Sequence, residues 1–551
     1  MSRSIGQFLV ELLAVNQIDT VFGIPGVHNL ELYRGLAAAG GMKHVLMRHE
    51  QGAGFAADGY ARLSGRPAAC FVISGPGMTN ILTAVSQAYT DSIPLLVVAS
   101  APTSTSQGKQ WGVLHELHDQ TALASGVFGV ARAARTAEDV RDHLRLCLAS
   151  LRTGRPRPAY LEIPLDLLSQ GTTLDALRFE GAALLPQADQ DQVDAALRLL
   201  AVAARPVVIA GGGARAAGAE LQRLIATLDC PLFLTTAAKG VLPEAHPANF
   251  GASLPYPAAQ QLIADADVVL AVGTEIAETD LFYSTKLAMS GLLIRIDIDP
   301  VKLADHYAAD VCIWADARSA LCMLNQSLAG RLQNLSTGGA QSAAAAAPST
   351  RRGWCTSLGG SAQFRAAIDS SFDEKSRAMA GALRAIKAAL PWDAVVFTDM
   401  TQIAYLGNYA FAVDGPGQWF HPSGYGTLGY ALPAALGAKL AAPARAVVAL
   451  AGDFGVQFTL NELMTAVEAG QSLPLVVWNN GALGQIRDDM IAAGIPAIGV
   501  VARNPDFVAL AKACGARAVR VSVAAALTES LRNALHAPGP TLIEIDAGSF
   551  H

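Results

Sequence analysis

Two polar positions that follow neighbouring apolar runs carry residue types able to bind a metal ion. The run VVALAGD ends at Asp453, and the run LPLVVW is followed by Asn479 and Asn480. Such runs predict buried parallel strands, whose carboxyl ends share the sheet edge at which ligands bind in open α/β sheets. One carboxylate and one amide oxygen suit Mg²⁺, which completes its octahedron with phosphate and water. Either residue alone would be explained by a helix cap or a turn, but the pair predicts a metal–diphosphate site.

The segment between these two positions predicts one helix. In QFTLNELMTAVEAG, the apolar residues Leu460, Leu463, Met464 and Val467 recur at the spacing of a single helix face. This pattern predicts that the face packs on the sheet. Gly470 suits the end of the helix.

A second acid stands near the other end of the chain. Glu50 follows the apolar run HVLMR and opens the helical segment EQGAGFAADGYARLSG. Alone, Glu50 is explained by a helix N-terminus, which favours a negative charge. A carboxyl group in an apolar place would, however, also be able to share a proton with a bound ring nitrogen.

The order of apolar and helical segments along the 551 residues predicts an α/β protein with three doubly wound domains and mainly parallel sheets. The pattern of strands restarts twice, which places the domains at residues 1–175, 185–325 and 360–551, with a low-complexity linker at 326–358. The apolar content of 52% is ample for several cores.

The composition also limits which partners and which cellular compartment are expected. A net charge of -6 without a basic run argues against nucleic acid, which demands clustered cations. Polar residues interrupt the first helical segment, and no apolar run could cross a bilayer, so neither a signal peptide nor a membrane anchor is expected. Seven scattered cysteines without CxxC spacing favour free thiols in a reducing cytoplasm.

The motif GDFG…NN resembles the thiamine diphosphate signature, in which GDG is followed about thirty residues later by NN. It departs from that signature by placing Phe454 at the third position and Gly455 one step later. The segments TVFGIPGVHNLEL, RHEQGA…ADGYAR and SGPGMTNILTAVSQAYTDSIPLLVV resemble the acetolactate synthase large subunit and 2-oxo acid decarboxylase family. The resemblance covers nearly the whole chain.

This resemblance implies thiamine diphosphate and Mg²⁺ as cofactors. It assigns the metal to Asp453, Asn480 and the main chain of Ala482, and cofactor activation to Glu50. It also implies that the pyrimidine-binding domain of one subunit meets the diphosphate-binding domain of another, in a homodimer or a homotetramer. The other residues expected to contact the cofactor are Thr401, Gln402, Gly426, Leu428, Phe454, Gly455, Leu483 and Gly484.

The middle domain carries a weaker signal. RPVVIAGGGARAAG contains Gly211 and Gly213 at the spacing of a dinucleotide fingerprint, and Asp297 and Asp299 follow a strand. The resemblance leaves room for FAD. The family's Arg-Phe-Asp-Asp run is replaced here by GTEIAETD, so a middle domain without a flavin is favoured.

The expected reaction follows from the cofactor. Its C2 carbanion adds to a 2-oxo acid, CO₂ leaves, and the resulting enamine is either protonated to an aldehyde or attacks a second carbonyl. Where acetolactate synthases carry Phe-Gln-Glu, this chain has Leu114, His115 and Glu116, and a histidine can protonate near neutral pH. His118 is equally well explained as a surface histidine. The residues expected near the substrate are Gly26, Val27, His115, Gln485, Asp488 and Asp489.

The sequence therefore predicts an enzyme that decarboxylates a 2-oxo acid and releases an aldehyde. The acidic pair Asp488–Asp489 could meet a cationic tail, as in 5-guanidino-2-oxopentanoate, although a solvated helix face explains it equally well. Acetolactate synthase activity is the close alternative. A flavin or nicotinamide oxidoreductase built on the Gly211–Gly213 loop is an alternative of another class.

Overall fold

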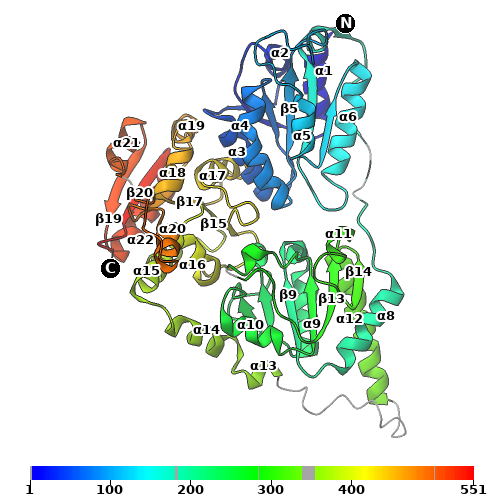
Figure 1. Ribbon diagram of the computed structural model, residues 1–551, viewed down its shortest axis with the longest axis vertical. Helices are drawn as coiled ribbons and strands as arrows, with labels where there is room; N and C mark the ends of the chain where they lie inside the picture. Colours follow the sequence, from blue (N-terminus) through cyan, green and yellow to red (C-terminus); the bar gives the residue numbers. More distant parts are fainter. Residues whose placement is uncertain are drawn as a thin grey trace. The chain divides into compact units, whose positions relative to one another are not determined.

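The computed structural model describes residues 3–179, 181, 184–282, 284–337, 354–501 and 503–550. They form two compact units (Figure 1). The first comprises Met1–Leu184, Ala388–Ala404 and Gly424–His551, and the second comprises Leu185–Lys387 and Tyr405–Ser423. Three parallel sheets lie in these units, two in the first and one in the second, which confirms the predicted fold class.

The N-terminal domain has a six-stranded sheet with the order β3-β2-β4-β5-β7-β6 and only parallel pairs. Neighbouring residues on its strands enter separate cores: Phe71 packs with the α1 side, whereas Cys70 packs with the α3 and α4 side. Both faces are therefore buried, which explains the continuous apolar runs. The elements are β2 (Thr20–Gly23), β3 (Lys43–Leu46), β4 (Ala69–Val72), β5 (Leu96–Ala101), β6 (Val130–Ala133), β7 (Ala159–Pro164), α1 (Ile5–Val15), α2 (Leu30–Ala38), α3 (Glu50–Ser64), α4 (Pro76–Thr90), α5 (Gln120–Ser125) and α6 (Ala137–Ser150).

The C-terminal domain repeats this design. Five parallel strands of its sheet follow the order β15-β17-β18-β20-β19. The elements are β15 (Val395–Thr398), β17 (Val447–Gly452), β18 (Leu473–Asn479), β19 (Arg517–Val521), β20 (Pro540–Asp546), α16 (Gln402–Ala410), α17 (Ala431–Ala441), α18 (Asp453–Phe458), α19 (Glu462–Ala469), α20 (Gly484–Ala492), α21 (Phe507–Ala513) and α22 (Ala524–His536).

The second unit contains the central sheet, with the order β11-β10-β9-β12-β13-β14 and only parallel pairs. Helix α12 continues to Thr337, into the segment expected to be a linker, and residues 338–353 of that segment lie outside the described part. The elements are β9 (Pro206–Ala210), β10 (Leu232–Leu234), β11 (Asn249–Gly251), β12 (Val268–Val272), β13 (Leu292–Asp297), β14 (Val311–Trp314), α8 (Gln190–Val202), α9 (Gly218–Leu228), α10 (Pro257–Ala264), α11 (Pro300–Leu303), α12 (Ala317–Thr337), α14 (Gly360–Ser370) and α15 (Glu374–Ala389).

Helices α3 and α17 hold the two domains of the first unit together, and glycine makes this contact possible. A Cβ atom on Gly59 would lie 1.9 Å from the carbonyl oxygen of Ala434, so only glycine fits there. Beside this contact, the buried Arg62 pairs with Asp58 and Asp91 at 2.6 Å each. The ADGYAR segment of α3 therefore forms part of the contact between the two domains of the first unit.

The predicted single helix between Asp453 and Asn480 is wrong. Two short helices, α18 and α19, stand there, and Met464 is exposed. The hydroxyl of Thr459 donates to the carbonyl of Gly429 at 2.7 Å, which interrupts the helix. Helix α19 then buries Glu462, whose carboxylate accepts the main-chain amide of His49 at 3.0 Å. This hydrogen bond, which the apolar periodicity does not indicate, explains why α19 buries the face that carries Glu462.

No helix of the described residues is long and apolar enough to cross a membrane.

Candidate active site

Strand ends bring Asp453 and Asn480 together. Gly452, the last residue of β17, lies in register with Trp478 of the neighbouring parallel strand β18. Asp453 is the first residue of α18, and its buried carboxylate accepts a hydrogen bond from the main-chain amide of Asn480. Burial raises the pKa of the Asp453 carboxyl, and the amide hydrogen bonds offset part of this shift. A bound cation would favour the ionised form in the same place.

Asn504 lies at the same corner, although its position in the sequence does not predict this. Its amide nitrogen donates to Asp453 Oδ2 at 2.6 Å and to Asn479 Oδ1 at 2.9 Å. The chain reaches this point because Ala482 forms an antiparallel bridge with Val501 after the α20 excursion. This contact depends on the tertiary fold, so local sequence spacing gives no signal for it.

The residues after Asn480 pack against Gln402. The amide of Asn480 donates to Gln402 Oε1 at 3.4 Å, and Gln402 donates to Asp488 Oδ2 at 2.8 Å. A Cβ on Gly484 would lie 2.4 Å from Gln402 Oε1, so the amide of Gln402 packs closely against the backbone at Gly484. Thr401 lies close to β17 in the same way, since a Cβ on Gly452 would lie 2.8 Å from its hydroxyl.

Asp399, which follows β15, organises the loop that carries Gly426 and Leu428. Its carboxylate accepts the amide of Gly429 at 2.9 Å and that of Met400 at 2.8 Å. Burial raises the pKa of Asp399 to about 6. A Cβ on Gly455 would lie 2.7 Å from Asp399 Oδ2. Glycine is therefore needed at the fourth position of GDFG, whereas the third position accommodates the half-buried Phe454.

Glu50 is the first residue of α3 and is buried. Its carboxylate Oε2 accepts a hydrogen bond of 2.9 Å from the side-chain amide of Asn80 on α4. A Cβ on Gly77 would lie 3.5 Å from Glu50 Oε1, so the first turn of α4 packs against the carboxyl group. Glu50 is therefore a buried carboxyl group that accepts a hydrogen bond from a neutral side-chain amide.

The loop after β5 places the two candidate histidines differently. His115 is half-buried, has a positive φ of 62°, and lies with its ring centroid 4.9 Å from that of His28. His118 is exposed and lies 3.3 Å from Gln110 Nε2. The structure therefore favours the surface explanation for His118.

The remaining expected substrate residues lie on two separate segments. Gly26 donates its amide to Asn29 Oδ1 at 2.8 Å, and Val27 is exposed in the same loop. On α20, Gln485 donates to Asp489 Oδ1 at 3.0 Å, and Asp488 pairs with Arg487 at 3.2 Å.

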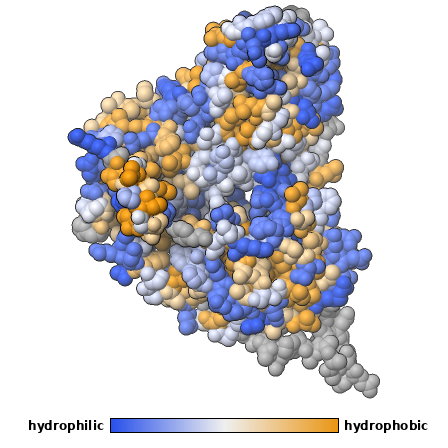
Figure 2. Space-filling model, viewed as in Figure 1, coloured by the Kyte–Doolittle hydropathy of each residue, from blue (hydrophilic) through white to orange (hydrophobic). Residues whose placement is uncertain are grey.

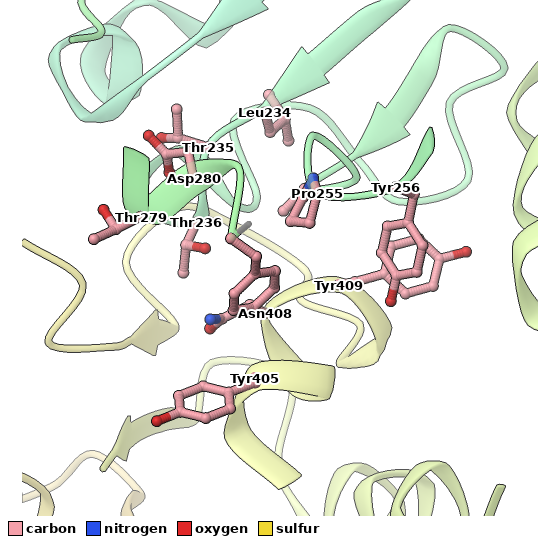
Figure 3. A pocket seen from close by; sticks show the side chains of 12 residues that line it. Leu234, Thr235, Thr236, Pro255, Tyr256, Thr279, Asp280, Tyr405, Asn408 and Tyr409 are labelled. Atoms are coloured by element: carbon pink, nitrogen blue, oxygen red, sulfur yellow. The ribbon is translucent and has the colours of Figure 1, made fainter. Parts of the chain in front are cut away.

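In the central domain, the backbone at Gly273 packs closely against the glycine loop that contains Gly211 and Gly213. A Cβ on Gly211 would lie 2.4 Å from Gly273 O, and one on Gly213 would lie 2.9 Å from Gly273 Cα. Close chain packing therefore accounts for both glycines without a nucleotide. A nearby pocket at the end of β10 is lined by Thr235, Tyr256 and other residues and has room for about one water molecule (Figure 3).

Among the described residues, no three His, Cys, Asp or Glu side chains gather in a way that could hold a metal. A cation at Asp453 would therefore take amide, carbonyl and phosphate oxygens, as Mg²⁺ does. This donor set fits a diphosphate-bound magnesium ion.

Comparisons with known proteins agree with this geometry. Residues 3–123, 193–324 and 399–545 match the N-terminal TPP binding, central and C-terminal TPP binding domains of thiamine pyrophosphate enzymes. The chain therefore belongs to the thiamine pyrophosphate enzyme family and binds this coenzyme, which is thiamine diphosphate.

Two relatives match this chain over nearly its full length. The chain is 48% identical to the Probable 2-ketoarginine decarboxylase AruI of Pseudomonas aeruginosa, over 98% of this chain and 93% of that protein. It is 30% identical to the Acetolactate synthase isozyme 3 large subunit of Escherichia coli, over 96% of this chain and 92% of that protein.

Proposed function

We propose that this chain is a thiamine diphosphate- and Mg²⁺-dependent decarboxylase that converts 5-guanidino-2-oxopentanoate, also called 2-ketoarginine, into an aldehyde and CO₂. The observation that carries the proposal is the 48% identity to a probable 2-ketoarginine decarboxylase across 98% of the chain. The 30% identity to an acetolactate synthase is much lower over a similar length.

Two separate groups of residues in this chain would bind the metal ion and activate the coenzyme. Asp453, Asn480 and the carbonyl of Ala482 would hold Mg²⁺ and through it the diphosphate, with Asn504 fixing the Asp453 carboxylate. Glu50, which is buried, would share a proton with the pyrimidine ring. When bound, thiamine diphosphate supplies the nucleophilic carbon and the electron sink that allow CO₂ to leave.

Four further segments would line the coenzyme. Thr401 and Gln402 would contact the diphosphate, together with the main chain from Phe454 to Gly455 and from Leu483 to Gly484. Gly426 would offer its carbonyl to the pyrimidine amine, and its φ of 72° suits glycine. Leu428 would bend the coenzyme as a wedge, on a loop that Asp399 holds through the amide of Gly429.

The acidic residues of α20 would recognise the guanidinium group. Asp488 and Asp489 are neighbours in a part-buried helix that begins beside Asn480. Carboxylates that already accept amide hydrogen bonds from Gln402 and Gln485 are oriented to receive a planar cation. The loop of Gly26 and Val27 would cover the other side of the substrate.

An active site shared between copies of the chain is part of the proposal. Figure 2 shows hydrophobic surface over the C-terminal domain, where Figure 1 places α20. The exposed apolar residues there include Ile491, Ile498 and Val501, with exposures of 61%, 74% and 64%. A patch of this kind marks an interaction site, and a homodimer or homotetramer in the cytoplasm would cover it.

The test is a product assay with purified protein, thiamine diphosphate and Mg²⁺. We expect CO₂ and 4-guanidinobutanal from 5-guanidino-2-oxopentanoate, with a kcat/KM at least about 100-fold above that for pyruvate. Asp488→Asn together with Asp489→Asn should lower this preference and leave turnover of pyruvate unchanged or improved. Equal turnover of the two acids would refute the substrate assignment.

Acetolactate synthase activity is the second candidate, because full-length relatives with that name are 26–30% identical to this chain. The same assay separates the two reactions. Acetolactate formed from pyruvate, without aldehyde from either acid, would establish the second candidate instead of the first.

A further inference from the structure

Release of an aldehyde from a 2-oxo acid consumes one proton. The bond between the carbonyl carbon and the carboxylate breaks, its electron pair stays on the carbonyl carbon, CO₂ leaves, and that carbon gains one hydrogen. A histidine is suited to supply this proton near neutral pH. The sequence predicts His115 for this role, and the structure places a second histidine beside it.

His28 lies in the loop between β2 and α2 and is 8% exposed. Its Nδ1 lies 2.5 Å from the hydroxyl oxygen of Ser74, which is fully buried. The His28 ring lies 4.9 Å from the His115 ring between centroids, at an angle of 57°. Ser74 therefore fixes one ring of a pair of histidines in direct contact.

His115 combines a positive backbone φ with a buried ring nitrogen that lacks a hydrogen bond among the described residues. Its φ of 62° is rare for a residue with a side chain. Its Nδ1 is buried and has no hydrogen-bond partner among the described residues. Both features cost stability, and features of this kind cluster at functional sites.

The turn that starts at Ser74 lies between this pair and Glu50. A Cβ on Gly75 would lie 2.6 Å from His115 O, and one on Gly77 would lie 3.5 Å from Glu50 Oε1. The amide of Gly75 donates to Gln120 Oε1 at 2.9 Å. The same turn thus positions both the histidines and the carboxyl group expected to activate the coenzyme.

A buried network fixes this turn from behind. Gln120 donates to the hydroxyl of Tyr160 at 2.9 Å and to Glu162 Oε2 at 3.2 Å, and Tyr160 donates to the same carboxylate at 2.7 Å. Every member is satisfied, which makes the support rigid.

We propose that His28 and His115 work as one acid–base pair, in which His115 delivers the proton to the former carbonyl carbon and His28 is its positioning residue. This inference rests on the proposed decarboxylase function. His28 sets the orientation of the His115 ring through direct contact. Two rings this close cannot both carry a positive charge without a cost, so a charge on one ring disfavours a charge on the other.

The surrounding charges are consistent with this role. Burial and the neighbouring His115 lower the pKa of His28. The carboxyl groups near the pair are Glu50 across the turn, Glu162 behind Gln120, and Glu116 and Asp119 in the loop of His115. The last two carboxylates accept the main-chain amides of Gly112 and Ala122, both at 2.8 Å.

The first test needs no coenzyme. Histidine side chains of the full chain, labelled with ¹⁵N, are titrated by NMR in the wild-type protein, in His115→Gln and in His143→Gln. His143 is the matched control, because its Nδ1 is also buried and unpartnered among the described residues but lies on the regular helix α6. We expect the pKa of His28 to rise in His115→Gln, since a neighbouring positive charge is removed, and to stay unchanged in His143→Gln. An unchanged pKa of His28 in both variants would refute the coupling.

The second test separates proton delivery from structural support. In single turnovers with carboxyl-labelled 5-guanidino-2-oxopentanoate, and in parallel with pyruvate, His28→Gln should release CO₂ at nearly the wild-type rate. Aldehyde release should fall by up to about 10²-fold, the low end of what a general acid contributes, because His28→Gln leaves His115 in place but no longer orients its ring. His28→Asn keeps a partner for Ser74 but lacks the ring, so it should show the same defect.

Two results would overturn the proposal. One is an equal fall of CO₂ and aldehyde release, and the other is recovery of aldehyde release in His28→Asn, which would mark a structural role. Failure of the wild-type protein to release CO₂ from either acid would instead refute the proposed function, and with it the use of the pair. The thermal unfolding temperature of each variant identifies misfolding. If the His28 variants misfold, Ser74→Ala removes only the hydrogen bond to the His28 ring and should also slow aldehyde release more than CO₂ release.

Discussion

The side-chain amide of Asn80 donates a hydrogen bond of 2.9 Å to the carboxylate of Glu50. The two residues belong to different helices, α4 and α3, and Gly77 in the first turn of α4 packs on the same carboxyl group. The contact orients Oε2 of the Glu50 carboxylate. This arrangement is the structural basis for expecting Glu50 to act on the coenzyme.

Replacing Glu50 with Gln should abolish activation of the coenzyme. The amide keeps the shape and the contact with Asn80 but cannot share a proton with the pyrimidine ring. We expect exchange of the C2 hydrogen of bound thiamine diphosphate for deuterium, measured by NMR after acid quench, to slow by about 10²- to 10⁴-fold. Asn80→Ser should have a smaller effect, because it changes only the orientation of Glu50. Wild-type exchange in Glu50→Gln would remove the activation role.

Asn504→Ala should weaken binding of the metal without unfolding the domain. Loss of the group that orients a metal ligand commonly lowers affinity about 10- to 100-fold. The Mg²⁺ concentration that half-saturates coenzyme binding, measured by calorimetry after removal of metal with a chelator, should rise by that factor. The exposed Asn533 on α22 offers a control, and Asn533→Ala should bind like the wild type. Unchanged affinity in Asn504→Ala would show that its contact with Asp453 is irrelevant to the metal.

Glu462 should make the folded state sensitive to pH. Burial raises its pKa from 4.5 to about 6, so the folded state favours the protonated form. This contribution to stability is complete below pH 4.5 and is lost as the pH rises through about 6, a change of about 2 kcal/mol. Glu462→Gln has no such loss, so its free energy of unfolding relative to the wild type should improve by about that amount between pH 4.5 and 7.5.

The matched control for this titration is Glu468→Gln. Glu468 pairs with Arg48 at 2.5 Å but its side chain is 55% exposed. An exposed pair contributes about 0 to 1 kcal/mol, so its variant should follow the wild type at every pH. Denaturant unfolding at several pH values measures both variants. Parallel curves for Glu462→Gln and the wild type would show that the carboxyl group does not titrate in this range.

Surface hydrophobicity on α20 and the following loop should be buried between copies of the chain. Ile498 is 74% exposed, so Ile498→Asp should not disturb the fold of an isolated chain. We expect sedimentation velocity to show smaller particles for this variant, together with loss of decarboxylation. The exposed Val301 on α11 of the central domain, at 72%, gives a matched control in Val301→Asp. An unchanged sedimentation coefficient for Ile498→Asp would contradict the proposed interface.

The sequence predicted the parallel sheets and the strand ends, because both follow from apolar runs and their polar termini. It also predicted that Asp453 and Asn480 meet, since neighbouring parallel strands end at one edge. It failed where tertiary contacts override local pattern. The buried Glu462 and the hydroxyl of Thr459 divide the expected helix, and no apolar periodicity records either contact.

Two residues that matter to the site could not have been found by spacing. Asn504 reaches Asp453 only through the bridge between Ala482 and Val501. His28 meets His115 only because two loops that follow different strands converge. Gly211 and Gly213, which match a dinucleotide fingerprint in sequence, pack closely against Gly273.

Glu50 of one subunit and Asp453 of another are proposed to serve the same coenzyme. This sharing is tested by mixing two inactive variants, Glu50→Gln and Asp453→Ala, after dissociation and reassembly. In a mixed dimer one of the two sites would take an intact Glu50 and an intact Asp453, so about a quarter of the wild-type decarboxylation should return in an equimolar mixture. If both acids acted within one chain, or in unrelated sites, every site would remain defective, and a mixture with no activity above that of the separate variants would contradict the account.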